Sequence, residues 1–300
     1  MENENFRCGF VTIVGRSNVG KSTLMNRMVG MKIAITSSKP QTTRKRIKTV
    51  YTGKNGQIIF VDTPGIHTAK NALSEYMDKA AIGALSDVDL IVWVVEASPF
   101  VGPADKEIAG LIRQSKGKVI LAVNKTDRIK KDEILPVIDA FRKQVDTLAI
   151  IPVSALKGTG IEDLRNEIIK NLPVSPPLYD EDTVTEETVR ALSEEIIREK
   201  ILRCLNDEVP HGVAVEIERM KEKEHITEID AVIVCERDSH KGIIIGKGGA
   251  MIKKIGSKAR ADIEDMLESH VNLKLFVKVR KDWRDNEALV KSYGYDVRDL

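Results

Sequence analysis

Nine residues near the start of the chain have the types and the spacing that phosphate binding requires. The stretch GRSNVGKST, from Gly15 to Thr23, holds two glycines, a lysine and a hydroxyl residue between an apolar run and a helix-length segment. Glycines let backbone N–H groups approach phosphate oxygens, while Lys21 can reach the β- and γ-phosphates and the Ser22 hydroxyl can ligate magnesium. The stretch therefore predicts a nucleoside triphosphate site made of Gly15, Arg16, Ser17, Asn18, Val19, Gly20, Lys21, Ser22 and Thr23.

The tetrapeptide NKTD indicates which base the nucleotide carries. It follows the apolar run KVILAV, so it lies at the carboxyl end of an expected strand, where open α/β sheets bind ligands. The Asp127 carboxylate can accept two hydrogen bonds from the ring N–H and the exocyclic amine of guanine, whereas adenine presents a lone pair at the ring position. Losing two charged hydrogen bonds costs on the order of 10²-fold or more in affinity. We therefore expect GTP, contacted by Asn124, Lys125 and Asp127.

Two weaker motifs complete the nucleotide site because of their order along the chain. DTPG, from Asp62 to Gly65, ends the apolar run QIIFV and supplies a carboxylate for magnesium and a glycine N–H for the γ-phosphate. SAL follows the last apolar run, and the backbone N–H groups of Ser154, Ala155 and Leu156 are expected to meet the guanine carbonyl. An ordinary serine turn is the alternative interpretation of SAL.

The polar segment TSSKPQTTRKR contains the threonine that we expect to respond to the γ-phosphate. Such a threonine can ligate magnesium when the γ-phosphate is present and fall away when it is absent. Thr43 is the first choice and Thr42 the second, and without a γ-phosphate the segment is expected to be a solvated basic loop. The predicted magnesium ligands are Ser22, Thr43 and Asp62, and the residues expected to act in hydrolysis are Lys21, Thr43, Gly65 and Asn18.

A second phosphate-binding feature lies far along the chain, in GIIIGKGGAMIKKIG. The sequence GKGG occupies Gly246 to Gly249, and side-chain-free residues let a sugar-phosphate backbone approach the main chain. From Lys241 to Arg260 the chain carries six basic residues and no acidic one, although its overall net charge is only +2. A basic patch of this kind is typical of a nucleic-acid-binding face, and a solvated lysine-rich helix is the alternative. The expected RNA contacts are Lys241, Gly246, Lys247, Gly248, Gly249, Lys253 and Lys254.

The elements that must position these residues change character halfway along the chain. Up to about Leu172, continuously apolar runs alternate with amphipathic helix-length stretches, which is typical of a mainly parallel, doubly wound α/β sheet. A proline-rich acidic segment follows, and then a long helix, two strands, a helix–GKGG–helix unit and a last strand form a smaller α+β unit. We predict domains at 1–172 and 186–300, joined by a linker at 173–185. The expected strands are FVTIVG, RIKTVYT, QIIFVDT, DLIVWVVEA, KVILAVNKT and LAIIPVS.

Composition excludes several other classes of protein. With 42% hydrophobic and 31% charged residues, the 300-residue chain is typical of a soluble protein with two domains. The start, MENENFRC, lacks the features of a signal peptide, and no apolar run reaches the ~18 residues of a membrane-spanning helix, so we expect a cytoplasmic protein. Cys8, Cys204 and Cys235 form no CxxC pair, so reduced thiols are expected instead of disulfides or a zinc site.

The motifs GRSNVGKS, QTTR, DTPG, NKTD and SAL, followed by GKGG, resemble the Era family. The resemblance implies a P-loop GTPase domain and a C-terminal type II KH domain, with hydrolysis of GTP to GDP and phosphate in the presence of Mg²⁺. It also implies binding of the 3′ region of 16S ribosomal RNA and a role in assembly of the small (30S) ribosomal subunit. Peripheral association with the cytoplasmic membrane is implied by resemblance only, and a monomer is expected.

The sequence departs from Ras-like enzymes at the residue after DTPG. Ras-like enzymes place a water-orienting glutamine there, whereas this chain has Ile66, which has no hydrogen-bonding group, so slow intrinsic turnover is expected. Related GTPases with an asparagine at the position of Asn18 bind potassium beside the phosphates. We hypothesise the same for Asn18, because its carbonyl oxygen is a hard ligand; a turn residue that tolerates unusual backbone angles is the alternative.

The main interpretation is a GTP-hydrolysing switch whose nucleotide state controls RNA binding. The acidic run from Asp180 to Glu187 suggests, from charge alone, that it lies against the basic KH face in one state. The alternative is a constitutive RNA-binding assembly chaperone whose nucleotide site does not cycle. A GTPase for transfer-RNA modification is a further alternative, which the KH-like half disfavours.

Overall fold

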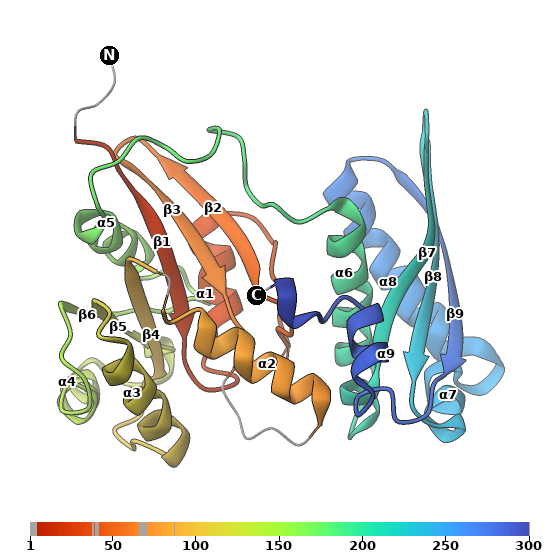
Figure 1. Cartoon of the computed structure of the whole chain (residues 1–300), viewed down its shortest axis with the longest axis horizontal. Coiled ribbons are helices and arrows are strands. Elements are labelled where there is room, and N and C mark those ends of the chain that lie inside the picture. Colours follow the sequence, from red (N-terminus) through yellow and green to blue (C-terminus); the bar gives the residue numbers. More distant parts are fainter. Residues whose placement is uncertain (1–4, 38, 40–41, 66–70, 87, 300) are drawn as a thin grey trace.

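The molecule consists of two halves that lie side by side and are joined by one long connecting segment (Figure 1). The computed structural model describes residues 5–37, 39, 42–65, 71–86 and 88–299. The N-terminal half carries a six-stranded sheet and the C-terminal half a three-stranded sheet. Within these described ranges, no helix combines the length and the apolar composition that crossing a membrane requires.

The six strands of the first sheet coincide with the six apolar runs of the sequence. Their order in the sheet is β2-β3-β1-β4-β5-β6. The pair β2–β3 is antiparallel and all the other pairs are parallel, so the prediction of a mainly parallel sheet is confirmed. The strands are β1 (Arg7–Val14), β2 (Ile47–Gly53), β3 (Gly56–Asp62), β4 (Leu90–Glu96), β5 (Val119–Asn124) and β6 (Ala149–Pro152).

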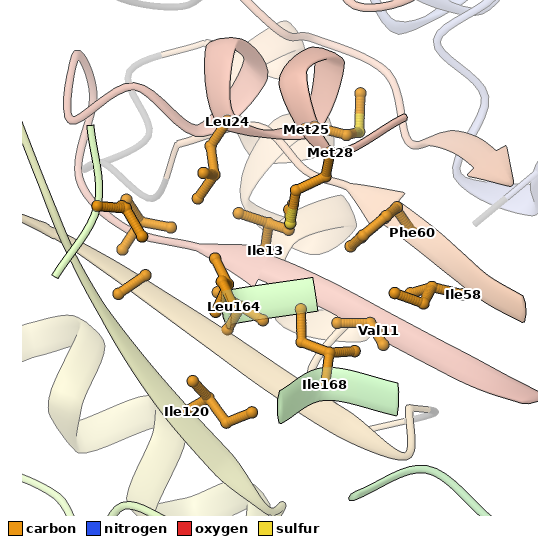
Figure 2. Packing of buried hydrophobic residues seen from close by; sticks show 14 of the residues in the cluster. Val11, Ile13, Leu24, Met25, Met28, Ile58, Phe60, Ile120, Leu164 and Ile168 are labelled. Carbon is orange, nitrogen blue, oxygen red and sulfur yellow. The ribbon is translucent and has the colours of Figure 1, made fainter. Parts of the chain in front are cut away.

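Helices cover both faces of this sheet, which explains why its strands are apolar on both sides. On one face α1 and α5 pack against β1, β3 and β4 in a core that includes Leu24, Met28 and Leu164 (Figure 2). On the other face α3 and α4 pack around Trp93 and Phe141. The helices are α1 (Lys21–Val29), α2 (Ala72–Gly83), α3 (Pro103–Ser115), α4 (Ile134–Phe141) and α5 (Ile161–Asn171), with 3₁₀ turns at Thr126–Arg128 and Lys131–Glu133.

The C-terminal half has the predicted order of helix, two strands, helix–GKGG–helix and strand. Its sheet has the order β7-β8-β9, with β8 and β9 parallel, and α6 and α8 cover one face through Ile201, Ile255 and Ile263. A short helix, α9, was not expected. The elements are α6 (Val189–Cys204), β7 (Ala214–Lys223), β8 (Ile226–Cys235), α7 (Asp238–Ile245), α8 (Ala250–Leu267), β9 (His270–Val279) and α9 (Glu287–Ser292), with 3₁₀ turns at Val209–Gly212, Lys247–Gly249 and Val297–Asp299.

The connecting segment is not a free linker, and we call residues 173–187 the strap. Val184 accepts a hydrogen bond from Val50 N at 2.8 Å, so the strap extends the edge of the sheet at β2. The Gln57 side chain accepts bonds from the backbone N–H groups of Leu178 and Tyr179 at 2.8 and 3.0 Å. The acidic end therefore lies on the first half, where Glu186 pairs with Lys48 at 3.2 Å. Among the described residues no ion pair joins this run to the basic KH face, which was the contact expected for one of the two states.

The two halves share a small apolar core. The Trp283 ring is fully buried and donates from Nε1 to the Gly212 carbonyl at 3.0 Å. It stacks on Tyr295, which meets Tyr76 of α2 edge to face with 5.7 Å between ring centroids. The segment after β9 thereby joins the outer face of the C-terminal sheet to α2, the helix that follows DTPG.

Candidate functional site

A cavity of about 580 Å³ opens at the carboxyl ends of the strands of the first sheet. It brings together residues from the glycine-rich loop, the polar segment after α1 and the NKTD motif, which are far apart in the sequence. The lining residues are Ser17, Asn18, Gly20, Lys21, Ser22, Thr23, Thr36, Ser37, Lys39, Thr42, Thr43, Gly65, Lys125, Arg128 and Arg203.

The glycine-rich loop holds its lysine inside the protein. The Lys21 Nζ donates to the carbonyl oxygens of Gly15 and Arg16 at 2.8 and 3.1 Å, so the loop wraps around the ammonium group. Burial lowers the pKa of Lys21 to about 8, while the Asp62 charge opposes the shift. A phosphate beside Lys21 supplies negative charge and favours the protonated form.

The three predicted magnesium ligands come together. The Thr43 hydroxyl lies 3.1 Å from both Asp62 Oδ2 and Ser22 Oγ, and Ser22 Oγ lies 3.5 Å from the same carboxylate oxygen. Burial raises the pKa of Asp62 to about 6, with Lys21 opposing that shift. Two hydroxyls and one carboxylate are hard oxygen donors, which is the ligand set that Mg²⁺ prefers, so these residues fit the ion.

The guanine end of the site is built around the buried Asn124. Its amide donates to Val19 O at 2.8 Å and accepts from Ala155 N at 3.0 Å, so it ties the glycine-rich loop to SAL. The Ser154 hydroxyl donates to Asp127 at 2.6 Å, and this bond lowers the pKa of that carboxyl group. Asp127 therefore stays ionised and exposed, ready to accept from guanine.

Part of the SAL backbone makes hydrogen bonds within the protein, and its expected contact with guanine stays a prediction. The Ser154 N–H bonds Thr159 O at 2.9 Å, and the Ala155 N–H bonds Asn124. Ser154 Oγ also accepts from Lys157 N at 3.1 Å, as in the serine turn that was the alternative. Among the described residues no hydrogen bond is made by the Leu156 N–H, and Arg27 Nη2 donates to the Leu156 carbonyl at 2.9 Å.

Glu96, at the end of β4, was missed by the sequence analysis. Its carboxylate pairs with Arg16 at 2.6 Å, Lys125 at 3.1 Å and Arg128 at 3.6 Å. Burial disfavours its charge, but the Lys125 hydrogen bond and the three cations hold the pKa below its ordinary value. Glu96 therefore connects the glycine-rich loop to NKTD and turns the Arg16 side chain away from the cavity. A carboxylate at the end of an apolar strand was the available signal.

The structure shows where Asn18 and Gly65 lie, two of the residues that we expect to act in hydrolysis. Its geometry does not test their roles. Asn18 is exposed, lines the cavity and has a left-handed backbone (φ +64°), so its turn role is evident and a cation-binding role stays a prediction. Gly65 lies against the loop, since a Cβ there would be 3.4 Å from Lys21 Nζ. Ile66 lies outside the described residues.

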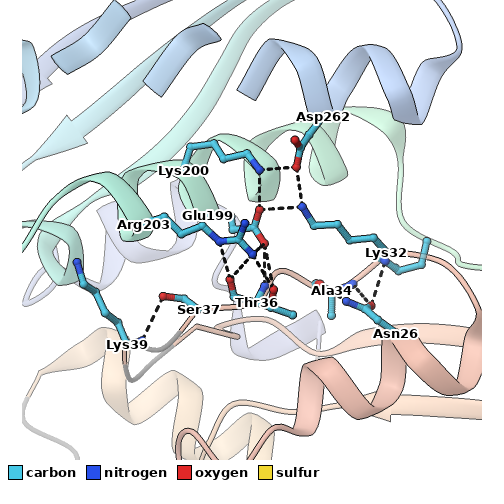
Figure 3. Close-up of polar contacts among 11 residues, drawn as sticks. Asn26, Lys32, Ala34, Thr36, Ser37, Lys39, Glu199, Lys200, Arg203 and Asp262 are labelled. Carbon is cyan, nitrogen blue, oxygen red and sulfur yellow. Dashed lines mark hydrogen bonds and ion pairs between the residues drawn. The ribbon is translucent and has the colours of Figure 1, made fainter. Parts of the chain in front are cut away.

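The polar segment that carries Thr43 is anchored in the other half of the molecule. Arg44 is fully buried and donates to the carbonyls of Val213 and His211 at 2.6 and 2.8 Å. Glu199 of α6 accepts from Thr36 N at 3.0 Å, and Arg203 donates to Thr36 O, as Figure 3 shows. These contacts could not be predicted from the sequence, because they join residues more than 150 positions apart.

The GKGG turn joins α7 to α8 as expected, and its glycines divide into two kinds. A Cβ at Gly246 would lie 2.7 Å from Met251, so this glycine is required for packing. Gly248 and Gly249 have left-handed backbones and open space around their Cα atoms, so a ligand backbone can approach them. The surrounding basic side chains are exposed, with Lys241 half-buried, and they are Lys247, Lys253, Lys254, Lys258 and Arg260.

Comparison with known families matches both halves. Residues 10–125 match the family described as 50S ribosome-binding GTPase, and residues 208–284 match the KH domain family. The chain is 50% identical to the GTPase Era of Lacticaseibacillus paracasei, over 97% of this chain and 98% of that protein. It is also 50% identical to the GTPase Era of Clostridioides difficile, over 97% and 99%.

Solved structures of Era proteins share the whole fold. An Aquifex aeolicus Era variant bound to GDP·AlF₄⁻ has a TM-score of 0.93 at 39% identity and covers 96% of this chain and 99% of that one. Era in complex with MgGDPNP and nucleotides 1506–1542 of 16S ribosomal RNA gives the same TM-score and identity, with 97% and 99% covered. On this full-length similarity, the chain belongs to the Era family of GTPases.

Proposed function

We propose that the protein hydrolyses GTP to GDP and phosphate with Mg²⁺, and that its KH domain binds the 3′ region of 16S ribosomal RNA during assembly of the small ribosomal subunit. The observation that carries the nucleotide part is the convergence of Ser22, Thr43 and Asp62 on one point beside the buried Lys21. These groups come from three separate motifs, which the fold brings together at one point.

The chain's own residues divide the work of the reaction. Lys21 and the loop N–H groups neutralise the phosphates, and Asp127 selects guanine. Ser22, Thr43 and Asp62 would hold Mg²⁺, which supplies positive charge for the β- and γ-phosphate oxygens. Thr43 and Gly65 report the γ-phosphate, because each lies beside the phosphate end of the cavity.

Phosphate release with and without Mg²⁺ tests hydrolysis. We expect slow turnover that a chelator abolishes and that Thr43→Ala reduces about 10²-fold in kcat, with Thr42→Ala as the matched control. If no phosphate is released, with or without a 16S 3′ fragment, the protein is instead the constitutive RNA-binding chaperone with a non-cycling nucleotide site.

The RNA part of the proposal rests on the exposed GKGG turn and its lysines. The broad GTPase family is described by binding to the large ribosomal subunit, but the Era structure similar over the whole chain contains small-subunit RNA, and we adopt the small subunit for this chain. A KH loop of this type clamps about four nucleotides of backbone. Specific bases would then be read by the neighbouring groove.

Salt-dependent binding tests the RNA contacts. Lys247→Ala and Lys253→Ala should weaken binding to every RNA sequence and lower the slope of log K against log salt by about 0.7 each. Lys143→Ala, an exposed lysine of the GTPase half, is the control. An unchanged slope in both KH variants would remove these lysines from the interface.

The potassium hypothesis for Asn18 belongs to the proposed function as well. Asn18→Gly keeps the left-handed backbone and removes the carbonyl ligand, so it separates the two interpretations. We expect wild-type turnover to be faster in potassium than in sodium and the variant to lose this difference. Equal rates in both salts for the wild type would rule the ion out.

Three further predictions depend on the resemblance or on sequence composition. They are a cytoplasmic location with peripheral membrane association, a monomeric state, and domain boundaries at 172 and 186. Sedimentation and fractionation of the full chain test the first two, and limited proteolysis tests the third.

A further inference from the structure

One residue of the RNA-binding half lines the nucleotide cavity. Arg203 lies in the last turn of α6, and its guanidinium borders the cavity together with Thr36, Lys39 and Thr43. Figure 3 shows it reaching from α6 toward Thr36. Its side chain is 45% exposed, so a ligand in the cavity can reach it.

The lining of the cavity is matched to a polyanion. Among its described lining residues are five cations, Lys21, Lys39, Lys125, Arg128 and Arg203, and no carboxylate. Lys125 and Arg128 are paired with Glu96, and Lys39 donates to the Leu205 carbonyl. Lys21, Lys39 and Arg203 therefore line the cavity without an ion pair to a carboxylate of the GTPase half among the described residues, and Arg203 pairs with Glu199 of its own helix at 3.0 Å.

Arg203 is also the surplus cation of the cluster that holds it. That cluster contains two carboxylates, Glu199 and Asp262, and three cations, Lys32, Lys200 and Arg203. Lys32 bridges both carboxylates at 2.9 and 2.6 Å. Lys32 and Lys200 balance the two carboxylates, so Arg203, which pairs with Glu199 Oε1 at 3.0 Å, adds a net positive charge to the cluster.

The remaining bonds of Arg203 are to neutral acceptors. Nε and Nη2 donate to Thr36 O at 3.1 and 3.0 Å, and Nη2 also donates to Thr36 Oγ1 at 2.9 Å. Nη1 makes no hydrogen bond within the described part of the chain. Phosphate oxygens make stronger, bidentate bonds with arginine than neutral carbonyls do, so a phosphate in reach outcompetes Thr36.

We propose that Arg203 is a nucleotide-binding residue, whose guanidinium contacts phosphate oxygens of the guanine nucleotide, so that the RNA-binding half completes the nucleotide site. This inference rests on the proposed function. It names a contact that joins the two activities, since α6 packs through Ile197 and Ile201 against α8, which begins at GKGG. By reciprocity, RNA that shifts α6 changes nucleotide affinity by the same factor as nucleotide changes RNA affinity.

Nucleotide binding to single-residue variants of the full chain tests the proposal. Arg203→Gln keeps a hydrogen-bond donor for Thr36 and removes the positive charge. Arg203→Lys keeps the charge but lacks the two parallel N–H donors of the guanidinium. We measure GDPNP and guanosine affinities by competition with a fluorescent GDP, and check folding by thermal unfolding. Arg203→Gln should weaken GDPNP about tenfold, the scale of one charge-assisted hydrogen bond, and leave guanosine unchanged, with partial recovery in Arg203→Lys.

The control variant is Arg190→Gln, which lies on the same helix and donates to the Ile217 carbonyl away from the cavity. It should bind both ligands like the wild type. The proposal is overturned if Arg203→Gln binds GDPNP as the wild type does, or if GDPNP and guanosine weaken equally, because equal loss means a general disturbance of the pocket. A wild-type chain that fails to bind GDPNP at all contradicts the proposed function instead.

Discussion

Asp62 is a proposed magnesium ligand whose charge changes between neutral and mildly acidic pH. Its burial raises the pKa to about 6, so the native protein loses this negative charge as pH falls through that value. Protons and Mg²⁺ compete for the same oxygens. We expect Mg²⁺-dependent GDPNP binding to weaken about tenfold between about pH 7.5 and about pH 5.

Asp127, in the same site, is the control for this pH titration. Asp127 has a lowered pKa, so it stays ionised over this window, and guanosine affinity should not change with pH. Asp62→Asn should bind GDPNP weakly at both pH values. A pH dependence that persists in Asp62→Asn would assign the titration to another group.

Glu96 provides a second test at the residue scale. Glu96→Gln removes the ion pairs with Arg16, Lys125 and Arg128, and Arg16 keeps only its longer contact of 3.6 Å with Asp105. Because these contacts do not involve the γ-phosphate, GDP and GTP affinity should fall by the same factor, roughly 3- to 10-fold, with kcat little changed. Glu107→Gln, on the exposed side of α3, should show no effect in the same titrations.

The sequence analysis identified the site residues that belong to short motifs. Lys21, Asp62 and Asp127 stand at fixed distances from glycines or strand ends, so their neighbours along the chain reveal them. Glu96 and Arg203 act through partners brought near by folding. The local signal for Glu96 is only its place at the end of an apolar strand, and no local spacing marks Arg203.

At the scale of elements, one buried side chain holds the middle of the strap. Gln57 of β3 is fully buried and exchanges hydrogen bonds with the backbone of Leu178 and Tyr179, including a donation to Tyr179 O at 2.8 Å. Gln57→Ala leaves these groups without partners, so we expect a loss of about 2 kcal/mol in the free energy of unfolding. Thermal unfolding measures this loss, and limited proteolysis should cut the loosened strap faster.

An exposed glutamine supplies the comparison for the strap. Gln114→Ala on α3 should change neither the unfolding temperature nor the rate of cleavage. If Gln57→Ala is cleaved no faster than the wild type, the strap is held mainly by its β2 contacts.

The elements themselves were largely predictable. Most strands of the first sheet are continuously apolar runs, and Ile255, Ala259 and Ile263 mark the buried face of α8 by their spacing. The strap was not, because its prolines and acidic residues are typical of a free linker. What fixes it is a polar residue inside an apolar strand, whose pairing only the folded structure reveals.

At the scale of the whole molecule, Trp283 holds the halves together. Trp283→Ala removes a fully buried ring from the shared core, so we expect a loss of about 3–5 kcal/mol in the free energy of unfolding. Trp283→Phe keeps a ring and loses the Nε1 bond to Gly212, and its cost should be smaller. Denaturant titration followed by circular dichroism measures both, and equal costs would mean that the ring's area contributes little.

Thr43 and Arg44 are neighbours in the chain, yet the first belongs to the magnesium site and the second is buried among the carbonyls of the other half. Consecutive Cα atoms are about 3.8 Å apart, so no flexible segment separates the magnesium site from the buried contact with the other half. Melting should therefore be a single calorimetric transition, and Mg²⁺ with a GTP analogue should raise its temperature for both halves together. In thermodynamic terms, the nucleotide is a stabilising ligand of the RNA-binding half as much as of the half that surrounds it.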